Sequence, residues 1–457
     1  MTRGGADLAT RVNSRGGRWA SKLRGMAVGE NGSGFVVTGR LSRMIGTTLE
    51  ARGCESVVGG RCLLLDQEGH RAEAEVVGFA DGALLMMPTD RLHGMMPGAR
   101  VIPSRRVFEA RVGPELLGRV LDGAGHPIDG LGSPNCEHRV RLQPETINPL
   151  GRGLIREPLD VGVRSINALL TVGRGQRLGL FARSGVGKSM LLGMMTRHTK
   201  ADVIVVALVG ERGREVQEFI TETLDAESRR RAVVVATPAD YPPLMRVHSA
   251  LLATSIAEYF RDQGRHVLLL MDSLTRVAQA QREIALAIGE PPVQRGFPVS
   301  VFARIPELVE RAGNAGPAGG SITAFYTVLT EGDELSDPVA DAARAVLDGH
   351  LRLSPELADS GVYPAIDVAL SVSRAALSIT TPDQQAAVAR YRELNAVYER
   401  NRDMVTLGAY TAGRDPVLDQ AVQLRQNMLA FLRQKPSEAV NVQQSFAQLA
   451  AVLGEGG

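Results

Sequence analysis

A glycine-rich turn between two apolar segments carries residue types that bind phosphate. Residues 178–192 read Leu-Gly-Leu-Phe-Ala-Arg-Ser-Gly-Val-Gly-Lys-Ser-Met-Leu-Leu, an apolar strand followed by a turn and an apolar helix. Glycines let backbone N–H groups converge on phosphate oxygens, Lys188 can reach the β- and γ-phosphates of ATP, and the Ser189 hydroxyl can bind Mg²⁺. The strict motif has glycine where this chain has Ala182. The predicted nucleotide contacts are Ala182, Arg183, Ser184, Gly185, Val186, Gly187, Lys188, Ser189 and Met190.

Two carboxylates follow other apolar runs. Residues 267–271 form a continuous apolar run that ends in Asp272, which is typical of a central parallel strand with an acid at its ligand-binding end. Asp272 is therefore predicted to complete the metal site with Ser189; the alternative is a core strand followed by an ordinary helix cap. Another apolar run, 203–209, is followed by Glu211, which we predict to orient the attacking water. A surface ion-pair cluster is the alternative for Glu211.

With these residues in place, the chain resembles the catalytic subunits of the rotary ATPase family (F-type and V-type), most closely the flagellar protein-export ATPases. The resemblance spans most of residues 148–374. The segments that carry it are 157–164, 166–177, 210–216, 257–264, 272–276, 280–292, 320–333 and 363–367. The flagellar branch, rather than the virulence-secretion branch, is indicated by Asp160-Val-Gly-Val, by residues 167–176 and by Ser184-Gly-Val-Gly-Lys188.

The resemblance also implies roles for residues outside the loop. Arg212 and Glu215 would act around the metal and the water. Arg374 would enter the neighbouring subunit's site and stabilise charge on the transferring phosphoryl group; its alternative is a surface ion pair. Tyr363 would stack on adenine, and Phe431 would close the other side of the adenine pocket. The alternatives are a buried tyrosine with its hydroxyl satisfied elsewhere and, for Phe431, core packing.

Arg183 departs from the family, which usually has glycine there. Its long side chain can lean outward into solvent. Alternatively, its guanidinium could reach the γ-phosphate or a neighbouring chain. We favour the solvent-facing orientation, because the loop needs backbone N–H groups at this position more than side-chain freedom.

Composition narrows the class of protein. The 457 residues include 52 basic and 50 acidic ones, a net charge of +2, and only 4% are aromatic, so neither charge nor base stacking favours a nucleic-acid partner. No run approaches the roughly 18 apolar residues that span a bilayer, and the N-terminus lacks a signal peptide's apolar core. The cysteines show no metal-ligand spacing, which favours reduced thiols in a cytoplasmic protein.

The expected fold class is α/β, with four parts. Residues 1–25 carry six basic residues against Asp7 and read as a weak basic amphipathic helix or, alternatively, a solvated leader. Residues 26–102 read as a small β-barrel, with strands at 35–38, 61–65, 72–79 and 83–87. Residues 103–375 read as a P-loop (RecA-like) ATPase domain that follows a turn-rich bridge, 103–148. Residues 376–457 read as a helical domain.

The core elements follow from apolar periodicity. Strands are predicted at 177–182, 203–209, 233–236, 267–271 and 321–330, and helices at 189–198, 214–224, 245–263 and 338–346. The C-terminal helices are predicted at 383–406, 416–433 and 437–453, with Gly408 and Gly413 between the first two.

The function that the resemblance implies is Mg²⁺-dependent ATP hydrolysis by a homohexameric ring that energises flagellar type III protein export. The implied partners are a dimeric negative-regulator or stator-like protein at residues 1–25, a central stalk-like protein, the export gate, chaperone–cargo complexes and anionic lipid. The chain would lie in the cytoplasm, at the inner membrane of the flagellar base. The alternatives are a virulence-secretion ATPase, a rotary ATP synthase subunit, a non-catalytic nucleotide-binding subunit and a ring helicase.

Overall fold

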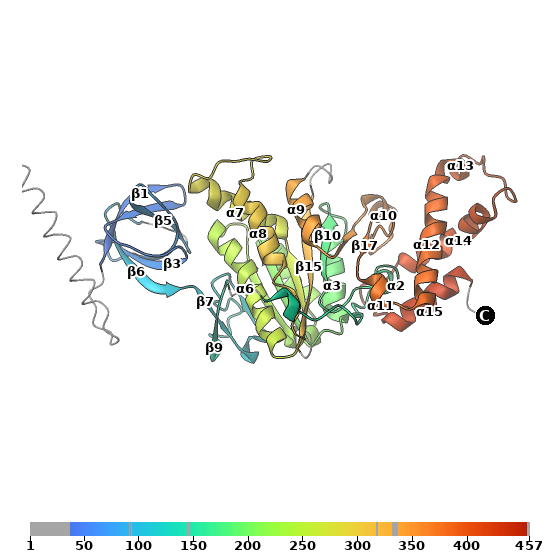
Figure 1. Ribbon diagram of the computed structural model, residues 1–457, viewed down its shortest axis with the longest axis horizontal. Helices are drawn as coiled ribbons and strands as arrows, with labels where there is room; N and C mark the ends of the chain where they lie inside the picture. The colour runs from blue at the N-terminus through green and yellow to red at the C-terminus, as the bar shows by residue number, and fades with distance from the viewer. Residues whose placement is uncertain are drawn as a thin grey trace, which may run out of the picture. The chain divides into compact units, whose positions relative to one another are not determined.

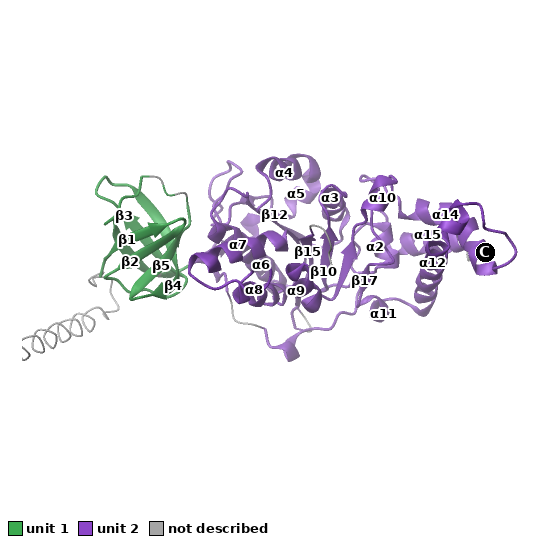
Figure 2. Cartoon of the chain, turned by 90° about the horizontal axis from the view of Figure 1, so that it is seen from above, with its two compact units in different colours: residues 1–107 green, residues 108–457 purple. Residues whose placement is uncertain are grey.

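The computed structural model describes residues 37–90, 92, 94–143, 147–316, 319–330 and 337–454. The chain divides into two compact units, residues 1–107 and 108–457 (Figure 2). The predicted basic helix at 1–25 lies outside the described residues. Within the described part of the chain, no helix has the length and apolar character needed to cross a membrane.

The first unit contains a closed six-stranded barrel, which confirms the predicted architecture. Around the barrel the strands follow the order β1, β2, β5, β4, β3, β6. Their bounds are β1 Gly39–Ile45, β2 Thr48–Arg52, β3 Gly60–Leu65, β4 Arg71–Ala80, β5 Ala83–Pro88 and β6 Arg100–Val107. In β3 the buried residues are Gly60, Cys62 and Leu64, since alternate side chains of a strand point inward.

The predicted strand at 35–38 has no counterpart among the described residues, and the barrel's first strand begins at Gly39. Residues 37 and 38 lie outside any strand, and 35 and 36 are not described. The barrel strands β1, β2 and β6 were not identified from the sequence, because their exposed faces carry arginines and other polar residues that interrupt the apolar pattern.

A nine-stranded sheet forms the centre of the second unit within the described residues (Figure 1). Its order is β17, β16, β10, β15, β13, β11, β12, β8, with the short β14 beside β15; β14 and β17 are antiparallel and the other neighbours parallel. The bounds are β8 Val120–Leu121, β10 Arg177–Ala182, β11 Val203–Val209, β12 Ala232–Thr237, β13 His266–Asp272, β14 Gly313–Asn314, β15 Ser321–Leu329, β16 Gly349–Arg352 and β17 Val372–Ser373. The five predicted core strands are all present, because strands covered on both faces are apolar throughout.

Helices cover the sheet. The long helix α6 packs on β11, β12 and β13, and α7 packs on β15 (Figure 1). The bounds are α2 Arg164–Leu169, α3 Lys188–His198, α4 Gly213–Glu218, the π-helix η3 Phe219–Thr223, α5 Ala226–Arg230, α6 Pro243–Asp262, α7 Leu274–Ala287, α8 Val299–Val309 and α9 Pro338–Val346. The predicted helix at 214–224 is thus an α-helix that continues as a π-helix.

The predicted bridge at 103–148 is wrong in part. It contains the end of β6, the hairpin of β7 (Glu109–Val112) with β9 (His138–Arg141), the helical turn η1 (Pro114–Leu116) and β8. Strand β8 extends the central sheet by pairing with β12. A two-residue strand is too short to produce a periodic signal, so only its pairing reveals it.

The C-terminal region is helical, as predicted. It contains α12 Pro382–Arg400, α13 Arg402–Thr406, α14 Pro416–Leu432 and α15 Val442–Leu453, and the shorter elements before it are η2 Pro149–Gly151, α10 Pro355–Asp359 and α11 Ala376–Ile379. The last helix begins at Val442 rather than at the predicted residue 437, because residues 433–441 are held in extended and turn conformations by contacts with the nucleotide-binding domain.

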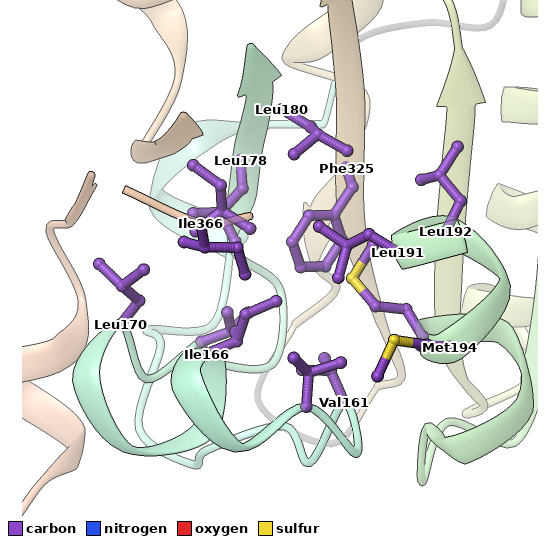
Figure 3. Packing of buried hydrophobic residues seen from close by; sticks show 14 of the residues in the cluster. Val161, Ile166, Leu170, Leu178, Leu180, Leu191, Leu192, Met194, Phe325 and Ile366 are labelled. Atoms are coloured by element: carbon purple, nitrogen blue, oxygen red, sulfur yellow. The ribbon is translucent and has the colours of Figure 1, made fainter. Parts of the chain in front are cut away.

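One continuous core joins these helices to the sheet. Figure 3 shows part of it, with Leu191 and Met194 of α3 facing Ile166 of α2 and Phe325 of β15. The apolar positions of α3 therefore fix the helix that begins at the glycine-rich loop, and with it the position of Lys188.

Candidate active site

The glycine-rich loop connects β10 to α3. Strand β10 ends at buried Ala182, and α3 begins at Lys188. Gly185 and Gly187 have φ of 83° and 90°, in the left-handed region that favours glycine. The N-terminus of α3 points its free N–H groups into the loop, where they can bind an anion. The residues from Arg183 to Gly185 are exposed and accessible to a ligand.

Lys188, Asp272 and Glu211 come together at this loop. The Lys188 ammonium lies 2.6 Å from Asp272 Oδ1 and 3.5 Å from Glu211 Oε1. Strands β11 and β13 are neighbours in register, so the residue that ends β13 and the residue two positions beyond β11 meet at one edge of the sheet. A further contact fixes Asp272, because the Thr327 hydroxyl of β15 donates to Oδ1 at 2.7 Å.

Burial and charge perturb the protonation of this cluster. Burial acts to lower the pKa of Lys188, but the charges of Asp272 and Glu211 outweigh it, so the pKa is raised and the ammonium is kept. Burial, together with the nearby Asp272 charge, raises the pKa of Glu211 to about 7, although Lys188 opposes the shift. A carboxyl group with a pKa near neutrality is suited to accept a proton from water.

A cavity of about 310 Å³ adjoins the cluster. Ser189, Glu211 and Asp272 all line it, so the hydroxyl and the carboxylates face a common space. Mg²⁺ in nucleotide sites takes one or two protein oxygens and receives the rest from phosphates and water. The oxygen donors of Ser189 and Asp272 fit that requirement. Among the described residues, no group of three or more His, Cys, Asp or Glu is arranged to hold a metal by itself.

Arg212 and Glu215 lie at the beginning of α4. The Arg212 side chain is 85% exposed and pairs with Glu215 at 3.7 Å. Glu215 also lines the cavity, and its nearby carboxyl group contributes to the raised pKa of Glu211 after burial and the Asp272 charge. Glu215 is thus linked to the buried cluster, whereas Arg212 faces solvent in this structure.

Tyr363 lies against the loop although it is distant in sequence. A Cβ added at Gly187 would come within 3.2 Å of the Tyr363 ring, so the ring covers this part of the loop. The ring is half-buried. That Tyr363 stacks on adenine, as the family resemblance implies, remains a prediction. The structure places its ring beside the phosphate-binding turn.

Phe431 is 2% exposed and lies in the core of the helical region. Its ring packs on Tyr391, with centroids 6.1 Å apart, and beneath the Arg164 guanidinium at 5.7 Å. Core packing, the alternative given for this residue, fits this position, and the predicted contact of Phe431 with adenine stays a prediction.

Arg374 lies far from this loop within its own chain. Its N–H donates to the carbonyl of Asp348, whose N–H in turn donates to the carbonyl of Arg177, the first residue of β10. The loop follows the other end of β10, which at about 3.3 Å per residue places it roughly 15–20 Å away. The exposed Arg374 side chain therefore cannot complete its own chain's site.

Arg183 is exposed. The pKa of Glu356, in α10, is lowered chiefly by the Ser354 hydroxyl, which donates to it at 2.6 Å, and the positive charge of Arg183 contributes less. Its outward orientation remains a prediction for the nucleotide-bound protein.

Two residues at the site were not identified from the sequence. Thr327 is a polar residue within the apolar run of β15, and that interruption was the only available signal. Arg276, in the first turn of α7, packs its aliphatic stem against Gly210, and its buried Nε has no hydrogen-bond partner. The contact of Arg276 with the turn after β11 could be found only after folding brought α7 next to β11.

The parallel sheet, the glycine-rich loop and the carboxylates at neighbouring strand ends define a P-loop ATPase. Residues 162–373 match the ATP synthase alpha/beta family, nucleotide-binding domain, and residues 380–451 match the T3SS EscN ATPase C-terminal domain. A flagellum-specific ATP synthase of Pseudomonas aeruginosa is 56% identical over 424 residues, covering 92% of this chain and 94% of that one. A type 3 secretion system ATPase of Xanthomonas euvesicatoria is 47% identical over 412 residues, covering 90% and 92%.

Solved structures agree with these sequence matches. The assembled ATPase EscN from the enteropathogenic E. coli type III secretion system superimposes with a TM-score of 0.86 at 41% identity, covering 91% of this chain and 100% of that one. EscN in complex with its central stalk EscO gives a TM-score of 0.83 with the same identity and coverage. The chain belongs to the ATP synthase alpha/beta family, among the flagellum-specific ATP synthases and their type III secretion relatives, and it is an ATP-binding ATPase.

Proposed function

We propose that this chain hydrolyses Mg-ATP as a homohexameric ring and couples that hydrolysis to the export of flagellar proteins. The observation that carries the proposal is the convergence of Lys188, Asp272 and Glu211 at the glycine-rich loop. One cation and two acids at a helix N-terminus supply the groups that phosphoryl transfer to water requires.

Binding of ATP would exchange the partners of Lys188. In the described state its ammonium is held by two carboxylates, so the phosphates must compete with both for it. Ser189 and Asp272 would hold Mg²⁺, which neutralises charge on the phosphate oxygens when bound. Once Lys188 turns to the phosphates, Glu211 is free to orient a water molecule and accept its proton. Glu215 would help to keep the pKa of Glu211 raised, and Arg212, which pairs with Glu215, would act around them.

The position of Arg374 supports the proposed ring. Because this exposed arginine lies at the opposite end of β10 from its own loop, it would act in a neighbouring copy's site. A head-to-tail contact of that kind produces a ring when the rotation between neighbouring copies closes. EscN has been solved as an assembled ATPase and with its central stalk EscO, which supports an assembled state and a stalk-like partner for this chain.

The remaining partners rest on family membership. We propose that residues 1–25 bind a dimeric regulator and anionic lipid, placing the ring in the cytoplasm beside the inner membrane at the flagellar base. The export gate and chaperone–cargo complexes would be further partners. Tyr363 would contact the adenine base from its position beside Gly187.

Deletion and complementation in the source bacterium test this function. The deleted strain should be non-motile and retain flagellar proteins inside the cell, and the wild-type gene should restore export. The Lys188→Ala gene should not restore it, although the protein accumulates to the same level. A motile deletion strain would contradict the flagellar assignment.

A second candidate is a virulence-secretion ATPase, which the Xanthomonas relative and the EscN structures favour. The same deletion strain distinguishes the two. Normal motility with loss of secreted virulence proteins would establish the second function in place of the first.

A further inference from the structure

We infer that Gln434 is a positioning residue for Tyr363, holding its backbone so that the ring stays beside the phosphate-binding loop. The inference rests on the proposed ATPase function and deepens it. It concerns the extended connection 433–441, which follows α14 and returns to the nucleotide-binding domain before α15 begins.

Gln434 is 4% exposed, and its polar groups are all occupied. Its amide nitrogen donates to the carbonyl of Gly162 at 2.8 Å and to that of Glu438 at 2.7 Å. Its amide oxygen accepts from the N–H of Arg164 at 2.7 Å. Its own backbone N–H donates to the carbonyl of Tyr363 at 2.9 Å. A buried glutamine with this many bonds has one available orientation.

These contacts tie together three separate pieces of chain. Gly162 lies just before α2, and Arg164 is the first residue of that helix. Tyr363 follows α10, and Gln434 belongs to the connection after α14. The side chain of Gln434 fixes the connection on the α2 turn, and the backbone of the same residue then holds the carbonyl of Tyr363. The position of Tyr363 is therefore set by a side chain outside the ATP site.

The same connection also reaches the helix that carries Lys188. His198, the last residue of α3, contacts the carbonyl of Pro436 through Nε2 at 3.0 Å. Arg164 pairs with Glu438 at 2.8 Å, and Asn167 donates to the carbonyl of Val440 at 2.8 Å. The connection is thus anchored at both ends, and Gln434 is its contact with Tyr363.

The ring of Tyr363 packs where Gly187 has no side chain, 3.2 Å from the position of an added Cβ. A small displacement of the Tyr363 backbone would therefore move the ring relative to the loop. The phosphate contacts of the loop should change little, because Lys188 lies at the opposite end of α3 from His198, the residue that contacts this connection. The expected consequence is a selective loss of contacts to the base, with phosphate binding retained.

Gln434→Met tests this inference, because methionine has a similar length and no amide. Inhibition of ATP hydrolysis by ADP, which has a base, is compared with inhibition by pyrophosphate, which has none. The inhibition constant for ADP and the KM for ATP should rise about fivefold or more, while the constant for pyrophosphate changes less than about twofold. Gln423→Met, at an exposed position of α14, is the matched control and should leave both constants unchanged.

Equal losses for ADP and pyrophosphate, or no loss for either, would overturn the inference, since a purely structural role does not distinguish the two. Should Gln434→Met not fold, Gln434→Glu keeps the acceptor for Arg164 and should show the same selectivity to a smaller extent. A wild-type protein with no ATPase activity would instead refute the proposed function itself.

A double-mutant cycle tests the route through Tyr363. Tyr363→Ala should weaken ADP selectively, and Gln434→Met added to it should cause no further loss, because the side chain that it positions is already gone. Independent losses that multiply in the double variant would show that Gln434 acts by another route.

Discussion

The Lys188 ammonium, at the beginning of α3, and Asp272 Oδ1, at the end of β13, lie 2.6 Å apart although the two residues are 84 positions apart in the sequence. This ion pair occupies the lysine that a P-loop needs for phosphate, and Glu211 adds a second acid 3.5 Å away. In the nucleotide-free site, Lys188, Asp272 and Glu211 therefore form a compact charge cluster, and the binding of ATP must rearrange it.

Glu211 should destabilise the nucleotide-free protein at neutral pH. Its pKa is raised from 4.5 to about 7 in the folded state, chiefly by burial. Between these values the folded protein keeps a proton that the unfolded chain releases, so this contribution to stability falls as the pH rises. Glu211→Gln should therefore raise the melting temperature at pH 8 by roughly 2–4 °C. The gain should shrink toward pH 5, and an equal gain at both pH values would contradict the assigned pKa.

Arg374 should act in a neighbouring copy, so specific activity should rise with protein concentration. Arg374→Ala and Lys188→Ala chains should each be inactive. Their mixture should recover part of the activity, because an intact loop can then face an intact arginine. Constant specific activity across the assembly range, without recovery in the mixture, would mean that each chain has a self-sufficient site.

Arg183→Gly should have little effect. The side chain is exposed at the beginning of the loop, and the backbone N–H groups that bind phosphate remain. We expect the kcat and the KM for ATP to change by less than about threefold. Steady-state kinetics check this. A loss beyond about tenfold in either constant would make Arg183 a phosphate or subunit contact.

Lys188→Ala should abolish hydrolysis and leave the fold intact, because the ammonium is directed at the site and the helix is fixed by its apolar face. Circular dichroism and phosphate release from the purified variant check both halves of this expectation. Turnover near that of the wild type would exclude the assigned role of the loop. The variant leaves Asp272 and Glu211 without their shared cation, so weaker binding of Mg²⁺-free nucleotide should accompany the loss.

The central sheet was predictable because its strands are buried on both faces and are apolar throughout, as β11 and β13 show. The loop and the acids that follow β11 and β13 were predictable for a related reason, since charged residues at the ends of buried strands stand out. The short strands β8 and β16 were not, because two to four residues carry no period. Phe431 shows a second limit of sequence-based prediction. Its resemblance to an aromatic residue of the family could not decide between a contact with adenine and a position in the core.

Thr327 and Arg276 were missed because their roles depend on pairing between strands and on the packing of α7. Gln434 was missed for the same reason, since its contacts join segments about 70 and 270 residues apart. Charged residues of the site can be recognised in the sequence because they follow apolar runs, whereas the residues that position them produce almost no pattern of their own.

Glu211→Gln tests the central claim most directly, because it removes the proton acceptor and keeps the size and hydrogen bonding of the side chain. Nucleotide affinity is measured by titration with ADP, and turnover by the release of phosphate from Mg-ATP. Turnover should fall by about two orders of magnitude or more while the affinity for ADP changes less than about threefold. Turnover and affinity falling by the same factor, or turnover close to that of the wild type, would contradict the assignment of Glu211 as the residue that orients water.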